Sequence, residues 1–130
     1  MMSEKFTVEI ISPDKTIIKT ETSEVQIPSY EGEMGILKDH IQLITFLRPG
    51  IIKIKNGNEK KFFVEEGTVE FSNNNLLILT SKAKDLSNVD KKSLSNLLTE
   101  AEKRISDNKL TDKEKYLLSY KINTLKNINQ

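Results

Sequence analysis

The segment IIKIKNG, residues 51–57, decides the fold class. Its isoleucines alternate with lysines from Ile52 to Lys55, which places apolar and charged side chains on opposite faces of an extended strand. Asn56-Gly57 follows at once, and this pair is typical of a tight hairpin because both residue types tolerate a positive φ. The segment therefore predicts a strand that turns back into a second strand.

The same two-residue period extends from Phe6 to about Ser81, in short runs separated by turn residues. Pro49-Gly50 is one such turn, and we expect type II geometry there because glycine accepts the left-handed position. Many short strands with frequent turns are typical of a sandwich or barrel. We therefore predict an all-β sandwich over residues 1–86. Its inward-facing sets are expected to include Phe6, Val8 and Ile10, Val25 and Ile27, Ile52 and Ile54, and Leu77 and Leu79.

After about Asp85 the apolar period becomes helical, and glycine and proline no longer occur. Two amphipathic helices are expected, the first capped by Ser87 with Asp90. Thr111 and Glu114 have capping-box spacing for the second. Because the break near residues 107–110 is short, residues 87–130 are predicted to form an antiparallel helical hairpin. Its seam is expected to pair Leu94, Leu98 and Ile105 with Leu118, Ile122 and Leu125.

The amino-acid composition limits the classes of partner that the chain can attract by charge. The chain has 130 residues and a formal net charge of +1, so no overall field attracts it to nucleic acid. KKFF, residues 60–63, is the only basic run with aromatic residues, and it lies within a strand pattern. Residues 1–86 carry 11 Lys and Arg against 13 Asp and Glu, whereas residues 87–130 carry 9 against 6, so the tail is the basic part. There is no cysteine, and no apolar run approaches the roughly 18 residues of a membrane span.

The stretch EGEMGILKDH, residues 31–40, is the candidate for chemistry. It gathers Glu31, Glu33, Asp39 and the only histidine, His40. A histidine oriented by a carboxylate can act as an acid or base, but no phosphate-binding loop or nucleophile motif accompanies it. One histidine cannot supply the His-rich ligand set of a catalytic zinc site. We therefore predict no metal and no cofactor, and prefer a structural or interface role for His40 over a catalytic one.

A longer segment carries a family resemblance. VQIPSYEGEMGILKDHIQLITFLRPGIIKI, residues 25–54, resembles the region of the epsilon subunit of bacterial F-type ATP synthase that reads approximately V-P-G-x-E-G-x-x-G-V-L-P-G-H-A-P-L-L-T-x-L-x-P-G-x-x-x-I. FFVEEGTVEF and LLILTSKA resemble the strands that follow, and a two-helix tail completes the family architecture. Ser29 replaces a usual glycine, and Lys38-Asp39 replaces Pro-Gly. The positions that match without a gap are Pro28, Glu31, Gly32, Gly35, Leu37, His40, Leu43, Thr45, Leu47, Pro49 and Gly50.

The resemblance implies a non-catalytic rotor subunit of a proton-translocating F-type ATP synthase. In this family the sandwich packs against the gamma subunit and stands on the ring of membrane c subunits, so it carries rotation to the catalytic head. The chain is then expected on the cytoplasmic side of the bacterial inner membrane, held there only through the complex. The contact residues implied for the c ring and gamma are Glu31, Gly32, Glu33, Gly35 and His40.

The resemblance also implies a movable regulatory tail over residues 87–130. In the family the tail can meet the alpha and beta subunits transiently and restrain ATP hydrolysis, and the basic residues that suit this contact are Lys115, Lys121 and Lys126. Some members bind ATP through a motif resembling [IL]-D-x-x-R-A. The aligned positions here include Val89, Asp90, Ser93 and Leu94, which lack the arginine, so weak or absent ATP binding is expected.

Two other classes remain as alternatives. A free-standing ligand-binding β-sandwich would use the loop from Glu31 to His40 for a sugar or peptide. An enzyme would need His40 and a neighbouring carboxylate to turn over a small substrate. Copurification with gamma discriminates the first alternative, and turnover by the purified chain discriminates the second.

Overall fold

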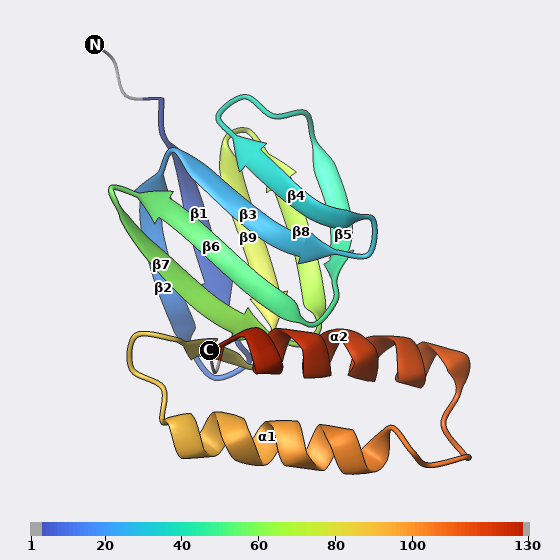
Figure 1. The fold of residues 1–130 in the computed structure, drawn as a ribbon. Helices are drawn as coiled ribbons and strands as arrows, with labels where there is room; N and C mark the ends of the chain where they lie inside the picture. Colours follow the sequence, from blue (N-terminus) through green and yellow to red (C-terminus); the bar gives the residue numbers. More distant parts are fainter. Residues whose placement is uncertain (1–3, 129–130) are drawn as a thin grey trace. The chain divides into compact units, whose positions relative to one another are not determined.

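The computed structural model describes residues 4–128. The chain divides into two compact units, residues 1–87 and 88–130. All ten strands of the described chain belong to the first unit, and both helices belong to the second (Figure 1). The predicted fold class, an all-β part followed by two helices, is confirmed.

The strands of the first unit form one antiparallel sheet with a single parallel pair, β1 with β9. The sheet runs in the order β10-β7-β6-β3-β5-β8-β9-β1-β2, and β4 pairs with β3 outside this path. The strands are β1 (Phe6–Ile11), β2 (Thr16–Thr22), β3 (Glu24–Ser29), β4 (Gly32–Leu37), β5 (Leu43–Leu47), β6 (Gly50–Asn56), β7 (Asn58–Val64), β8 (Gly67–Ser72), β9 (Asn75–Thr80) and β10 (Ala83–Asp85).

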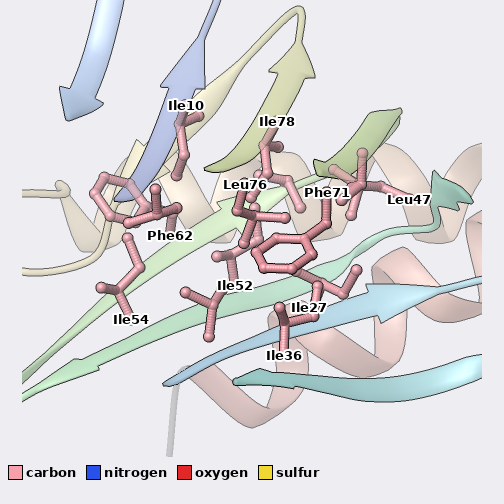
Figure 2. Close-up of a cluster of buried hydrophobic side chains, with 14 of the residues drawn as sticks. Ile10, Ile27, Ile36, Leu47, Ile52, Ile54, Phe62, Phe71, Leu76 and Ile78 are labelled. Carbon is pink, nitrogen blue, oxygen red and sulfur yellow. The ribbon is translucent and has the colours of Figure 1, made fainter. Parts of the chain in front are cut away.

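The sheet folds over so that β3, β6 and β7 cross β1, β8 and β9, and the core lies between the two layers (Figures 1 and 2). Its members alternate along each strand, as the two-residue period predicts. Figure 2 shows Phe71 and Ile78 from one layer facing Ile27 and Ile52 from the other. The cluster contains Phe6, Val8, Ile10, Val25, Ile27, Ile36, Leu47, Ile52, Ile54, Phe62, Val64, Val69, Phe71, Leu76 and Ile78.

In β9 the set of side chains that faces the core is the opposite of the predicted set. Leu76 and Ile78 are buried, whereas Leu77 is partly exposed and Leu79 is 44% exposed. Both alternating sets of LLIL are apolar, so a period of two cannot choose between them. The choice comes from pairing, since Ile78 lies opposite Val69 of β8 and Ile10 of β1, both of which are buried.

The turn at Pro49-Gly50 also differs from the type II geometry expected. Gly50 begins β6 and is not among the described residues with positive φ, so it does not occupy a left-handed position. It is a glycine for a different reason. A Cβ atom at this position would lie 2.5 Å and 2.9 Å from two side-chain carbons of Pro28. Glycine therefore lets β6 begin close against β3.

The hairpin predicted at Asn56-Gly57 forms, and a second asparagine-containing hairpin joins β8 to β9 with a different turn geometry. Between β6 and β7 only Gly57 has a positive φ, 76°, while Asn56 remains in the strand. Between β8 and β9 both turn residues are left-handed, with φ of 50° at Asn73 and 59° at Asn74. That second turn has the φ signs of type I′, which matches the twist of the flanking strands.

The second unit consists of α1 (Lys91–Arg104) and α2 (Asp112–Ile128), which run antiparallel (Figure 1). Leu94 and Ala101 of α1 and Leu118 and Leu125 of α2 are buried. Leu98, Ile105 and Ile122 of the expected seam are only partly buried. The connection between the helices spans residues 105–111 and is longer than the predicted break.

The two caps have different outcomes. Thr111 and Glu114 form the predicted capping box: the Glu114 amide donates to Thr111 Oγ1 at 3.1 Å, and the Thr111 amide donates to Glu114 Oε1 at 3.0 Å. The predicted pairing of Ser87 with Asp90 is wrong. Asp90 caps α1 alone by accepting from the Lys92 amide, while Ser87 donates to Asp85.

Candidate functional site

The turn between β3 and β4 positions Glu31. The Ser29 hydroxyl donates to the Gly32 carbonyl oxygen at 2.8 Å and accepts from the Glu31 amide at 3.2 Å. Gly32 has a φ of 117°, which side chains rarely tolerate. Ser29 is fully buried, so its hydroxyl bonds within the turn rather than to water. The serine that departs from the family pattern therefore stabilises the turn.

Glu31 points back onto the sheet and is bound there. Thr45 of β5 donates to Glu31 Oε2 at 2.9 Å and lies 3.3 Å from Oε1. The Thr45 hydroxyl, followed by the Glu31 amide and the Ser29 hydroxyl, holds the pKa of Glu31 below its usual value. The carboxylate is therefore ionised near neutral pH and already accepts a hydrogen bond from the Thr45 hydroxyl. A carboxylate with a lowered pKa and an existing donor is poorly suited to act as a general base.

Along β4 the side chains alternate between a core face and an exposed face. Ile36 faces the core, while Glu33, Gly35 and Leu37 are exposed. At Gly35 an added Cβ would meet only the Glu24 carboxylate, at 3.5 Å, so this face is open. Glu33 therefore stands on an accessible strip of β4, with little bulk beside it.

The loop that joins β4 to β5 is attached to the turn between β8 and β9. The Asp39 amide donates to Asn74 Oδ1 at 2.7 Å, and Asn74 Nδ2 donates to Asp39 Oδ1 at 2.9 Å. The His40 ring lies edge-on to Phe71, with centroids 5.9 Å apart, and its Nδ1 lies 2.8 Å from the Ile41 carbonyl oxygen. His40 is thus a packed and hydrogen-bonded residue.

These contacts do not assemble an acid–base pair from the candidate residues. Glu31 binds Thr45, Asp39 binds Asn74, and His40 packs against Phe71, so each has a different partner. Within the described chain, no three His, Asp or Glu side chains lie close enough to hold a metal ion. The geometry is that of a shaped surface with prearranged polar groups.

A second surface was missed from the sequence. On the outer face of the sheet, Phe46 of β5 lies opposite Thr68 of β8, Thr68 lies opposite Leu79 of β9, and Leu79 lies opposite Ile11 of β1. Phe46 is 56% exposed and Leu79 44% exposed. We call Phe46, Thr68, Leu79 and Ile11 the apolar stripe. It lines an open groove together with Ser12, Pro13, Glu66, Gly67, Thr80 and Ser81.

The signal for this stripe is present in the sequence. In LITFL the outward positions, Ile44 and Phe46, are as apolar as the inward ones, and LLIL has the same property. A strand that is apolar on both faces needs cover on both faces, or else it exposes an apolar surface. The second set of apolar side chains was therefore the available clue.

In the second unit the three candidate lysines have different surroundings. Lys126 Nζ lies 3.8 Å from Glu102 Oε2 on α1, so an acidic partner from the other helix faces it. Lys121 is partly buried, and Lys115 is exposed. At the start of α1, Asp90 is the cap and Leu94 is buried, so two of the aligned ATP-motif positions have structural roles.

Comparison with known proteins follows the same division of the chain. The family model of the ATP synthase delta/epsilon chain β-sandwich domain matches residues 5–85. The ATP synthase epsilon chain of Pelagibacter ubique is 49% identical over 130 residues, covering 98% of this chain and 100% of the relative. That of Leptospira interrogans is 36% identical over 104 residues, covering 79% of this chain and 82% of the relative.

Two solved structures share the fold. A chain in the structure of Euglena gracilis mitochondrial ATP synthase has a TM-score of 0.79 at 20% identity, covering 100% of this chain and 84% of that one. A chain in the central stalk and c-ring structure of Tetrahymena thermophila mitochondrial ATP synthase has a TM-score of 0.66 at 17% identity, with both chains fully covered.

The helices of residues 4–128 include none with the length and apolarity that crossing a membrane requires. The match to the family model covers the whole sheet, and the Pelagibacter relative extends the similarity through both helices. The resemblance found in residues 25–54 is confirmed: the chain belongs to the ATP synthase delta/epsilon chain family.

Proposed function

We propose that the chain is a central-stalk subunit of a bacterial F-type ATP synthase, linking gamma and the proton-driven c ring to the catalytic head. It contributes no catalytic residues of its own. It is held at the cytoplasmic side of the inner membrane through the complex. Family membership supports this role, and so does the absence of a converged acid–base set among the candidate residues in the described chain.

The observation that carries the proposal is the apolar stripe on a rigid sheet. Phe46 and Leu79 are large, exposed and neighbours across β8, and a groove runs along them. Large exposed apolar side chains beside a groove on a folded sheet are typical of a protein–protein contact. We assign the stripe to gamma, because gamma and this chain must turn together without slipping.

The loop from Glu31 to His40 is assigned to the c ring. Its exposed acid, Glu33, stands beside Gly35 on the open face of β4, where a polar partner can approach the backbone closely. Because the ring turns with this chain, charge complementarity there sets register rather than providing most of the affinity. Glu33→Lys should therefore weaken ring attachment and lower coupling, with Glu33→Gln as the control.

The hairpin is assigned a regulatory role, in which it opens and meets the alpha and beta subunits. Lys115 is exposed and suits an acidic partner, whereas Lys126 must first leave Glu102. Exposed ion pairs contribute little and are screened by salt. We therefore expect partial inhibition: removing residues 87–130 should raise ATP hydrolysis at low salt and leave synthesis intact. An unchanged hydrolysis rate would contradict this role.

The direct test is copurification. A tagged full-length chain, extracted with mild detergent from membranes of cells that express it, should bring gamma, alpha, beta and c subunits with it. Phe46→Glu should release the chain while it stays folded by far-ultraviolet circular dichroism, and Phe46→Leu, which keeps an apolar side chain, should not. Recovery of the chain without any other subunit would favour a free-standing ligand-binding sandwich.

A further inference from the structure

Three hydrogen bonds meet at Asn74, and two of them hold the β4–β5 loop, residues 38–42. Asn74 accepts from the Asp39 amide through Oδ1 and donates to the Asp39 carboxylate through Nδ2. The Asn74 carbonyl oxygen accepts from the Thr7 amide at 3.1 Å. One residue of the β8–β9 turn thus connects this loop with the start of β1.

The backbone at both ends of this contact is left-handed. Asp39 has a φ of 66° and Asn74 a φ of 59°. Asparagine and aspartate visit this region more readily than other side chains, but still at some cost relative to glycine. The paired hydrogen bonds between the two side chains and the Asp39 amide offset that cost, and they would be lost if either residue left this conformation.

The next residue is also anchored to the same hairpin. The His40 ring meets Phe71 edge-on at 88°, and Phe71 meets Phe6 edge-on at 5.6 Å. Phe71 and Phe6 are both buried, so the loop is attached to the core through an aromatic contact. The residue after His40, Ile41, is 79% exposed.

We propose that Asp39 and Asn74 are a positioning pair, which holds the β4–β5 loop in a preformed shape so that Ile41 is presented to the c ring. Both polar atoms of the Asn74 side chain already bind Asp39, so the role assigned to Asn74 is to hold the loop and not to bind the ring. A loop that is already ordered loses less conformational entropy when its partner docks. This inference rests on the proposed function only for the identity of the partner.

The structural half is tested on the isolated full-length chain. Asn74→Gly removes the side chain yet accepts the positive φ, so it deletes the pair without straining the turn. The matched control is Asn73→Gly, at the neighbouring left-handed position of the same turn. Amide hydrogen exchange measured by NMR should be about fivefold faster at residue 39 in the Asn74 variant, as expected for loss of one exposed hydrogen bond. It should be unchanged in the control.

The functional half is tested on washed membranes that contain the complex. Asn74→Gly should reduce retention of the chain and the rate of ATP synthesis about twofold to fivefold, while Asn73→Gly should match the natural chain. Unchanged exchange at residue 39 would overturn the pair. Faster exchange with full retention would overturn its positioning role.

Failure of this inference is distinguishable from failure of the proposed function. Glu33→Lys should reduce retention without changing exchange at residue 39, because the two hydrogen bonds between Asp39 and Asn74 do not involve Glu33. If Glu33→Lys releases the chain and Asn74→Gly does not, the ring assignment stands and the positioning pair is wrong. If neither variant releases the chain, the assignment of the loop to the c ring is wrong, and the positioning role toward the ring is wrong as well.

Discussion

The sandwich and the hairpin differ in how far along the chain their contacts reach. In the sandwich, β1 pairs with β9, and the core joins residues from Phe6 to Ile78. In the hairpin, burial falls on Leu94, Ala101, Leu118 and Leu125 of two successive helices. A network of distant pairings opens only as a whole, whereas a short helical pair can open locally. The sandwich and the hairpin of this subunit are thus built by different contact patterns.

The largest effect is expected where the sandwich is tightest. At Gly67 an added Cβ would overlap the Leu79 carbonyl oxygen and lie 3.1 Å from both Leu47 Cδ1 and Thr80 Cβ. Gly67→Ala should therefore lower the free energy of unfolding of the sandwich by about 3 kcal/mol, because paired backbone must move. Urea denaturation followed by circular dichroism measures it, and Gly35→Ala, which meets only a flexible carboxylate, should cost less than about 1 kcal/mol. Equal costs would show that the packing at Gly67 is not limiting.

Truncating a buried side chain of the hairpin should destabilise the hairpin and leave the stability of the sandwich unchanged. Leu118 is 6% exposed and is one of two buried residues of α2, so Leu118→Ala should destabilise the helical pair by about 2 kcal/mol. NMR should then show helix amides exchanging faster while the amides of β1 and β9 remain as protected as before. Loss of protection in both units would contradict the separation argued here. Leu117→Ala, at a partly exposed neighbour, is the control.

The capping box should contribute less, and with a pH dependence. Thr111→Ala should cost the hairpin about 1 kcal/mol, and Thr99→Ala in the middle of α1 should cost less. The Thr111 amide, then its hydroxyl and then Arg104, hold the pKa of Glu114 below the ordinary value of 4.5. The carboxylate therefore adds stability above that value, and this stability is lost as pH falls through the lower folded pKa. Helix melting followed from pH 7 to pH 3 should show the loss, and Glu114→Gln should abolish it.

The bond between Thr45 and Glu31 should give a smaller but more specific change. Thr45→Val keeps the buried shape and removes the donor, so the pKa of Glu31 should return toward its ordinary value. NMR titration of the Glu31 carboxyl carbon measures this shift, and Thr68→Val on the exposed face is the control. An unchanged titration would mean that the Ser29 turn alone determines the charge state of Glu31.

The smallest effect is expected from removing the hairpin. A chain that ends at Leu86 keeps β10 and the bond from the Leu86 amide to the Lys61 carbonyl oxygen. Its sandwich should unfold in urea at the midpoint seen for the sandwich amides of the whole chain. A chain of this length that stays unfolded by circular dichroism would show that the sandwich needs the hairpin.

The candidate segment could be chosen from the sequence, but the contacts of its side chains could not. The segment from Glu31 to His40 was identified from residue types and family pattern, because carboxylates, glycines and a histidine in ten positions are visible in any reading. That Glu31 would turn onto Thr45 and Asp39 onto Asn74 was not visible, since these partners lie 14 and 35 residues away. Hydrogen bonds across strands follow register, which local patterns do not encode.

The sequence by itself determined the order of β and α parts, the Thr111–Glu114 cap and the inward sets of β1, β3 and β6. Each of these depends on residues within one turn or one strand, where periodicity and capping rules act. Tertiary structure decided which face of LLIL is buried and which constraint requires a glycine at position 50. In both cases the local pattern allows two answers, and only the neighbouring strands, Val69 and Ile10 for the first and Pro28 for the second, exclude one of them.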